Sequence, residues 1–440
     1  MRIYKQNLTG LVGVGLVATI LMVGCGTSSK KITLKETELG SLMKVITKPT
    51  VMTKQLGGVH PPSKDTLEKM HRSQYILHAK DNKLTQIPVK KVLLPHAQPM
   101  NPQAGTSVDQ NLKGHVYVRQ DKTLCKSTDG GETWRAKEIT SPSGYSISQT
   151  GRWKVLGNGS FICVAVKTGK DERGPAEVWS SQDEGQSWNS IAKINIDMKM
   201  PGSEGTYDER YVHRGLDRLK DDTLLWMIDV RSDADPKTEL PRNHGLFQFR
   251  SNDGGQSWEG PLLVWDWGSE GAVTTLPSGN HLATLRYQRE RNPQDSPETI
   301  KYMGAYPKTP DKLGFKNVFL MDSTDGGASW TRPRMLTTVY GQTYGSPLSQ
   351  SDGTVVVVHD TRYGPGGPGS RALISRDEGK TWQDEVYYLD ATNFTGSYSA
   401  SVVFDDDTIL TIAASSVGYS WEEVEDKTDL YAIRWKPVKE

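Results

Sequence analysis

The octapeptide Ser127-Thr-Asp-Gly-Gly-Glu-Thr-Trp134 decides the fold, because close copies of it recur along the rest of the chain. Every copy has Ser, Asp, Gly and Trp at the same spacing, with Ser or Thr directly before the Trp. The copies begin at Ser127, Ser181, Ser251, Ser323 and Ser375. Regular recurrence of this kind indicates one structural unit that is repeated, and each unit must pack on its neighbours to bury a core.

Each shared position of the octapeptide suits a tight turn between two strands. The Asp side chain can accept backbone N–H bonds within the turn. The Gly supplies a positive φ, and the Trp ring can pack between neighbouring sheets. We therefore interpret the five aspartates as turn caps and not as catalytic groups.

A second repeated element alternates with the first and reads as a β-hairpin. Examples begin at Glu270-Gly-Ala-Val-Thr-Thr and at Tyr344-Gly-Ser-Pro-Leu-Ser, each followed by turn residues and an apolar strand. A hairpin, a third strand, the octapeptide turn and an outermost strand make a four-stranded antiparallel blade. We predict an all-β fold, a six-bladed β-propeller of such blades over residues 89–440, with the first blade starting near residues 89–95. Residues 25–88 are expected to form an N-terminal extension, with a helical turn or two at 63–70 and a hairpin within 75–94.

The N-terminus resembles an export signal. Arg2 and Lys5 precede an apolar run of residues 11–23, which is shorter than the roughly 20 residues that span a bilayer and fits a secretory signal over residues 1–24. Gly24-Cys25 resembles a bacterial lipobox, which implies cleavage before Cys25 and lipidation of its thiol. We expect an exported lipoprotein, anchored to a membrane through Cys25, at the outer membrane, the cell surface or the periplasmic face. A plain signal peptide with a chance Cys is the alternative.

Composition excludes several classes of protein. Lys plus Arg number 53 against 52 Asp plus Glu, which disfavours a nucleic-acid partner. The three Cys form no disulfide or zinc pattern, and Cys125 and Cys163 could either pair or remain buried thiols. The nine His form no metal-binding motif. We expect no metal and no cofactor, and we expect a monomer.

The repeated S-x-D-x-G-x-[ST]-W pattern resembles the Asp boxes of the sialidase superfamily, also called BNR-repeat proteins, over about residues 90–440. Glu270 and Arg286 resemble the sialidase pair in which a Glu opens an inner strand and an Arg closes the next. The segment around Tyr398 resembles the one that bears the tyrosine nucleophile. Arg362 or Arg371 matches the region of a substrate-binding arginine, with Arg362 favoured for function.

The resemblance implies that Tyr398 is the nucleophile and that Glu270 is the base that activates it. Arginines would grip a sugar carboxylate bidentately. The family's first-blade Arg-Ile-Pro and following acidic Asp are absent before Ser127. Arg152 and Arg214 open inner strands and could supply the missing positive charge. The general acid is left open among three candidates, Asp171, Asp208 and Asp217.

Two functions remain open at this point. The first is an exo-acting, sialidase-like glycoside hydrolase that removes a terminal acidic sugar from a glycan, either sialic acid or another carboxylated sugar such as a uronate. The second is a non-catalytic propeller that binds a glycan or a protein partner, because repeats of this type also occur in propellers that are not enzymes.

Overall fold

The computed structural model describes residues 46, 48–52, 62–95, 107–120, 122–167, 174–196, 209–211, 215–231, 244–293, 295–363, 367–391, 399–415 and 429–439. The expected signal segment, Cys25, Arg214 and Tyr398 lie outside these residues. Within the part that is described, no helix is both long and apolar enough to cross a membrane.

Four sheets of four or five strands form separate blades. The first is β4 Ser107–Gln110, β5 Val116–Gln120, β6 Thr123–Ser127 and β7 Arg135–Glu138. The second is β8 Lys154–Val155, β9 Phe161–Ala165, β10 Ala176–Ser181 and β11 Asn189–Ile194. The third is β12 Glu209–Tyr211, β13 Leu216–Arg218, β14 Leu224–Arg231, β15 His244–Ser251 and β16 Glu259–Asp266. The fourth is β26 Ala400–Val403, β27 Ile409–Ser415, β28 Asp429–Trp435 and β3 Lys90–Leu93.

The remaining strands form one eleven-stranded sheet. One part contains β17 Gly268–Thr275, β18 His281–Glu290, β19 Gly304–Tyr306, β20 Thr309–Ser323 and β21 Arg334–Met335. The other contains β22 Gln342–Ser349, β23 Val355–Thr361, β24 Gly369–Ser375, β25 Glu385–Tyr388, β1 Tyr75–Lys80 and β2 Lys83–Pro88. A single parallel bridge between Asn317 and Gln342 joins the two parts.

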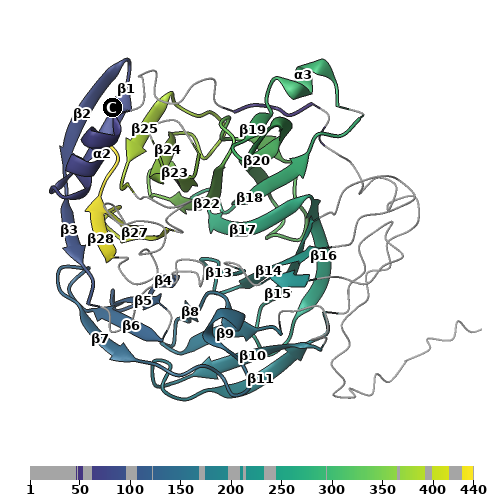
Figure 1. Ribbon diagram of the computed structural model, residues 1–440. Coiled ribbons are helices and arrows are strands. Elements are labelled where there is room, and N and C mark those ends of the chain that lie inside the picture. The colour runs from purple at the N-terminus through teal and green to yellow at the C-terminus, as the bar shows by residue number, and fades with distance from the viewer. Residues whose placement is uncertain are drawn as a thin grey trace, which may run out of the picture.

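The sheets are arranged around a common centre (Figure 1), so the predicted all-β propeller is confirmed. The prediction of six separate four-stranded sheets is wrong in detail. Hydrogen bonding gives four separate blades and one larger sheet, because β20 touches the start of β22 and because the β1–β2 hairpin extends β25.

The N-terminal strands complete blades that are otherwise built from the C-terminal half. We expected a first blade to start near residues 89–95, but β3 in that region pairs with β28 and closes the ring between the two ends of the chain. The predicted hairpin within 75–94 is present as β1–β2. The predicted helix is α2 Lys64–His71, which begins at the N-cap Ser63 and buries Leu67 and Met70. Two short helices complete the described structure, η2 Ile147–Thr150 and α3 Pro297–Ile300.

All five octapeptides form the same hydrogen-bonded turn. In the first, Ser127 Oγ donates to Asp129 Oδ1 at 2.7 Å, Gly131 N donates to Ser127 Oγ at 2.8 Å, and Thr133 Oγ1 donates to Asp129 Oδ2 at 2.5 Å. The other four repeat these bonds. The shared Gly has a φ between 82° and 91° in every copy. The prediction that the Asp caps the turn and the Gly supplies positive φ is confirmed.

The octapeptide turns all lie at one edge of the sheets. The Ser of each turn pairs with the residue that starts the second strand of its blade, directly after the inner hairpin turn. The pairs are Val116 with Ser127, Phe161 with Ser181, Leu224 with Ser251, His281 with Ser323, and Val355 with Ser375. We call this edge the box edge. Its Trp rings help to fill the space between blades, as Trp134 does against the core cluster that contains Val116 of β5 and Leu410 of β27.

Candidate functional site

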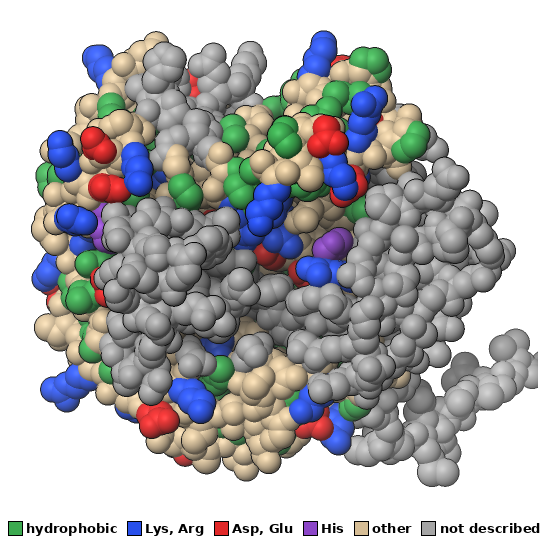
Figure 2. All heavy atoms as spheres, in the orientation of Figure 1, with side chains coloured by type: hydrophobic (Ala, Val, Ile, Leu, Met, Phe, Trp, Pro, Cys, Tyr) green, Lys and Arg blue, Asp and Glu red, His purple; other side chains and the backbone are tan. Residues whose placement is uncertain are grey.

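Charged side chains gather at the opposite edge, where the inner strands begin and the second strands end. Figure 2 shows basic and acidic side chains beside a hollow near the middle of this face. At this edge, Arg286 Nη1 donates to Glu270 Oε1 at 2.7 Å, and Glu270 N donates to Asp229 Oδ1 at 3.0 Å. We define the charged cluster as Asp229, Glu270, Arg286, Lys316 and Arg362. The first three are no more than 8% exposed, which makes their interactions strong and their ionisation costly.

The backbone at Glu270 is strained in a way that aims its side chain. Glu270 has a φ of 52° and lies in a bulge of β17 between Ser269 and Ala272. A non-glycine residue in this region costs about 1 kcal/mol or more and is enriched at functional sites. Gly271 follows because a Cβ there would lie 2.3 Å from Met227 Sδ. The bulge therefore turns the carboxylate of Glu270 toward Arg286 instead of letting it follow the strand's alternation.

Tyr344 occupies the equivalent position in the neighbouring part of the sheet, and the sequence analysis did not select it. It has a φ of 61°, lies in a bulge of β22 and is also followed by a Gly. Thr284 Oγ1 donates to Gly345 O at 2.8 Å and lies 3.5 Å from Ala272 O, so it links the two bulges. The sequence signal was the spacing to the inner hairpin turn. Glu270 and Tyr344 each stand six residues before the residue that opens the inner hairpin turn, which is Leu276 or Gln350. Tyr398 lies outside the described residues but stands six residues before Phe404, which opens the corresponding turn.

A second repeated position carries Asp229, Arg286 and Asp360. In each of these blades, the first residue of the second strand pairs with the Ser of the octapeptide; these first residues are Leu224, His281 and Val355. Asp229, Arg286 and Asp360 each follow that first residue by five positions. Asp229-Val-Arg231 and Asp360-Thr-Arg362 are thus the same Asp-x-Arg pattern on two blades. Asp229 was missed in the sequence analysis, and this repetition is the signal that could have found it. Ser399, next to Tyr398 in sequence, donates to Asp360 Oδ1 at 3.4 Å.

Two groups of the charged cluster titrate near neutral pH. Burial raises the pKa of Asp229 to about 7; the charge of Arg286 opposes this shift and the charge of Glu270 adds to it. Burial lowers the pKa of Lys316 to about 7, and the positive charges of Arg362 and Arg286 add to that shift while Glu270 opposes it. Both shifts move the pKa of these groups toward neutral pH.

The structure brings some of the predicted site residues together and separates others. Glu270 and Arg286 form a buried ion pair, and Arg362 acts electrostatically on Lys316 beside them. Arg371 instead hydrogen-bonds the backbone oxygens of Asp390 at 2.9 Å and Gly367 at 3.1 Å. Burial lowers its pKa to about 10, and we assign it a structural role.

The other predicted residues are more distant or not described. Arg152 is buried two residues before β8, close to the start of an inner strand as expected, and it belongs to the second blade. Asp217 Oδ2 accepts from Val273 N at 2.8 Å and joins two sheets. Arg214, Asp171, Asp208 and Tyr398 lie outside the described residues. Cys125 and Cys163 are both buried free thiols. Among the described residues, no group of three or more His, Cys, Asp or Glu is placed to hold a metal ion.

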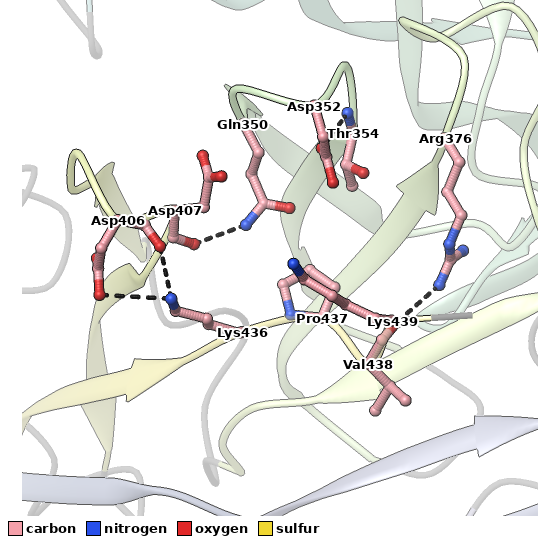
Figure 3. Close-up of a pocket in the computed structure, with 10 residues that line it drawn as sticks. All are labelled: Gln350, Asp352, Thr354, Arg376, Asp406, Asp407, Lys436, Pro437, Val438 and Lys439. Atoms are coloured by element: carbon pink, nitrogen blue, oxygen red, sulfur yellow. Dashed lines mark hydrogen bonds and ion pairs between the residues drawn. The ribbon is translucent and has the colours of Figure 1, made fainter.

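A polar cleft of about 300 Å³ lies at the box edge and not at the charged cluster. Figure 3 shows it between the turn at Gln350, the turn at Asp406 and Asp407, and the C-terminal segment. Its polar groups bond one another: Gln350 Nε2 donates to Asp407 O at 2.6 Å, and Arg376 Nη2 donates to Val438 O at 3.0 Å. These bonds connect neighbouring blades, so we assign the cleft a structural role.

Comparison with known proteins agrees with this architecture. Neither a protein-family model nor a curated protein sequence matches the chain. Among solved structures, a protein of unknown function from Dyadobacter fermentans has a TM-score of 0.52 at 16% identity, covering 78% of this chain and 98% of that one. An α-L-arabinofuranosidase from Fusarium graminearum has a TM-score of 0.51 at 14% identity, covering 79% and 97%.

A Hadza microbial sialidase has a TM-score of 0.51 at 16% identity, and the match covers 80% of this chain and 69% of the sialidase. At such identities the likeness supports a shared arrangement of strands, and the chemistry has to be argued from the residues of the site. These likenesses show that the chain shares its fold with these solved structures.

Proposed function

We propose that the chain is an exo-acting glycoside hydrolase, sialidase-like in mechanism, that removes a terminal acidic sugar from a glycan. The observation that carries the proposal is the buried Glu270–Arg286 pair, 2.7 Å apart, at the blade edge opposite the octapeptide turns. Propellers that hydrolyse glycosides stand among the similar solved structures, namely an arabinofuranosidase and a sialidase. This supports glycoside hydrolysis as the reaction class. The kind of sugar is inferred from the charges of the cluster.

In the proposed reaction, Glu270 is the base and Tyr398 is the nucleophile. Arg286 donates to the carboxylate of Glu270 and orients it, and the bond from Glu270 N to Asp229 holds its backbone. The Tyr398 phenol gives its proton to Glu270 as its oxygen bonds to the anomeric carbon. The glycosidic C–O bond breaks and the leaving oxygen takes a proton from an acid. Water then cleaves the sugar–tyrosine bond and restores the phenol.

An acidic sugar fits the charge of the cluster. Arg286, Lys316 and Arg362 place three cationic groups at one edge, against Glu270 and a largely buried Asp229. A carboxylate on the substrate would compensate this positive charge. A phenol nucleophile suits such a substrate because it is repelled less by that carboxylate than a carboxylate nucleophile would be.

The test is turnover of fluorogenic glycosides by the chain from Gly26 onward. The panel contains an α-sialoside, several uronides and, as a neutral comparison, an α-L-arabinofuranoside. We expect an acidic glycoside to be cleaved and Tyr398→Phe to lose at least about 1000-fold in kcat, since it removes the nucleophile. Tyr75→Phe, on β1 between β25 and the edge strand β2, is the matched control and should remain active. Thermal unfolding of each variant checks that the fold is kept.

The other outcomes are informative. Full activity of Tyr398→Phe together with loss in Tyr344→Phe would assign the nucleophile to the equivalent residue one blade away. Turnover of the arabinofuranoside alone would reject the acidic substrate. Binding of glycans without turnover of any member of the panel would favour the non-catalytic propeller.

Two finer points of organisation are also proposals. We propose that the eleven-stranded sheet functions as two blades, which would give six, because the described strands of its two parts share a single bridge pair, Asn317–Gln342. We further propose that the protein is exported and anchored through a lipid on Cys25. Cys25→Ser should release it from the membrane fraction of the producing bacterium, whereas unchanged membrane association would reject the anchor.

A further inference from the structure

Lys316 belongs to the charged cluster, but the catalytic steps outlined above assign it no individual role. It lies on β20, is partly buried, and its Nζ sits 5.4 Å from the ring centroid of Tyr363. Within the described part of the chain, its ammonium group makes no hydrogen bond or ion pair to a carboxylate. A partly buried ammonium that no carboxylate contacts directly is costly, and this cost is consistent with its depressed pKa of about 7.

The backbone holds Lys316 and Arg362 next to each other. Gly341 N donates to Lys316 O at 2.9 Å, and Arg362 N donates to Gly341 O at 3.0 Å. Gly341 thus ties the two residues together from strands that are far apart in sequence. Arg362 contributes to the shift of the Lys316 pKa, so their charges act on each other.

Strand alternation turns Lys316 toward the same side as Arg286. Arg286 pairs with Val318, and Lys316 lies two residues from Val318 on the same strand. Val318 packs into the core cluster that contains Val355 and Val357 of β23. Lys316 and Arg286 therefore both face β23, and Arg362 directly follows the last residue of that strand.

Arg286 is already committed to protein partners. Its Nη1 donates to Glu270 Oε1 at 2.7 Å and its Nε donates to Ser269 Oγ at 2.9 Å. We propose that Lys316, together with Arg362, binds the carboxylate of the acidic sugar in this protein, while Arg286 serves to orient Glu270. The proposal rests on the function proposed above and assigns the anion-binding role to a residue that the sequence resemblance did not indicate.

Tyr363 indicates that the anion is carried by a sugar and is not a small inorganic ion. Its ring is 40% exposed, next to Lys316, and it stacks on Tyr340 with centroids 5.8 Å apart. Tyr340 in turn contacts Tyr306, with centroids 4.8 Å apart. Aromatic side chains offer an apolar surface to the C–H groups of a ligand beside a polar anchor. A carboxylated sugar ring matches this pairing of cation and aromatic surface.

The test is direct binding of free sugars, measured by calorimetry on the chain from Gly26 onward. The probes are N-acetylneuraminate and D-glucuronate, with L-arabinose as the neutral comparison and inorganic phosphate as a competing anion. We expect one acidic sugar to bind more tightly than arabinose. Lys316→Met should weaken it at least about 10-fold, because a charge-assisted hydrogen bond is lost, and Lys316→Arg should retain most of the affinity.

Lys312→Met is the matched control, since Lys312 lies on the same strand but is exposed and contacts Glu290 at 3.9 Å. It should bind like the parent protein. Lys316→Met should unfold at the same temperature as the parent or a higher one, because a partly buried charge is removed. A folded Lys316→Met that binds the acidic sugar as well as the parent would overturn the proposal. So would a parent protein that prefers arabinose, or phosphate binding equal to that of both acidic sugars.

The pH dependence gives a second readout. The groups facing Lys316 are Arg286, Glu270, Arg362 and Tyr363, with Asp229 behind Glu270. Affinity for the acidic sugar should fall as pH rises from 6 to 8, because Lys316 loses its proton in that range. Lys316→Arg should flatten this fall, since a guanidinium stays charged. An unchanged slope would assign the titration to Asp229 and count against the role of Lys316.

These measurements separate the proposal from the proposed function. Binding of an acidic sugar that depends on Lys316, without turnover, would leave the binding site standing and reject the hydrolase. Turnover of an acidic glycoside with a KM that Lys316→Met leaves unchanged would leave the hydrolase standing and reject the site.

Discussion

The two edges of the blades are built on different principles. At the box edge, one set of hydrogen bonds within eight residues is repeated five times, with Ser Oγ to Asp Oδ1 distances of 2.7–2.8 Å throughout. At the edge of the charged cluster, one structural position carries Asp229, Arg286 and Asp360 on successive blades. There the partners are far apart in sequence, as with Asp229 and Glu270.

The difference shows how a repeated fold can carry a single site. Local, identical turns connect the strands at a low entropic cost, because each turn closes a short loop and satisfies its own polar groups. The opposite edge is then free to vary from blade to blade, and its buried charges are tolerated only because the surrounding sheets hold them in place. Changes at the two edges should therefore have different consequences for stability, activity and pH dependence.

The largest effect on stability is expected from Glu270→Ala. It leaves the guanidinium of Arg286, only 8% exposed, without its carboxylate. Breaking a buried pair on one side costs about 3–5 kcal/mol. The double variant Glu270→Ala with Arg286→Met should recover a large part of that loss, because both charges are gone. Denaturant unfolding of the two variants measures the difference.

An exposed ion pair serves as the control for this experiment. Lys48 and Glu298 are 3.2 Å apart with side chains 70% and 49% exposed. Glu298→Ala should cost less than about 1 kcal/mol. Equal losses in Glu270→Ala and Glu298→Ala would mean that Glu270 is not held in a low-dielectric environment, and the contrast between the two edges would disappear.

Much of the fold could be predicted from the sequence because the octapeptide is local. Ser127, Asp129 and Gly131 lie close in sequence and bond one another, so the pattern alone indicates the turn. The pairing of β3 with β28 could not be predicted in this way, since it joins the two ends of the chain and its short strand has no distinctive spacing. The bridge between Asn317 and Gln342 is likewise a tertiary contact.

The charged cluster was only partly predictable. Glu270 and Arg286 followed from a family resemblance and are confirmed as neighbours by their ion pair. Asp229 and Tyr344 were missed because a lone Asp in a strand or a Tyr before a Gly carries no local signal. Their position becomes visible only when blades are aligned on their hairpin turns. The position of Lys316 could not be predicted from the sequence, because it depends on a tertiary contact: Gly341 bonds to the backbone of both Lys316 and Arg362.

A smaller effect, with a defined pH dependence, is expected from Asp229→Asn. The pKa of Asp229 is about 7 in the folded protein against 3.8 when unperturbed. A raised carboxyl pKa means that the folded state binds the extra proton, so the stability from this group is lost as pH rises from about 4 to 7. The stability of the parent relative to Asp229→Asn should fall by up to about 4 kcal/mol across that range. A difference that stays flat or grows with pH would contradict the burial of this carboxyl.

The smallest effect is expected at the box edge, from Asp325→Ala. Asp325 accepts hydrogen bonds from Ser329 Oγ at 2.5 Å, Ser323 Oγ at 2.7 Å and Ser329 N at 2.9 Å. Losing such a cap costs about 1 kcal/mol, reduced by solvent screening because the carboxylate is exposed. Turnover should be unchanged, since the turn lies at the edge opposite Glu270.

The pH dependence of Asp325 should also have the opposite sign to that of Asp229. Hydrogen bonds from Ser329 and then Ser323 lower the pKa of Asp325 to about 2. A lowered carboxyl pKa contributes stability that is present above about 4 and lost as pH falls toward 2. The differences in unfolding temperature between the parent and each of Asp325→Ala and Asp229→Asn, measured from pH 2 to 8, should thus change in separate pH windows, about 2–4 for Asp325 and about 4–7 for Asp229. Overlapping windows would mean that the two edges do not differ in the way their carboxyl groups are held.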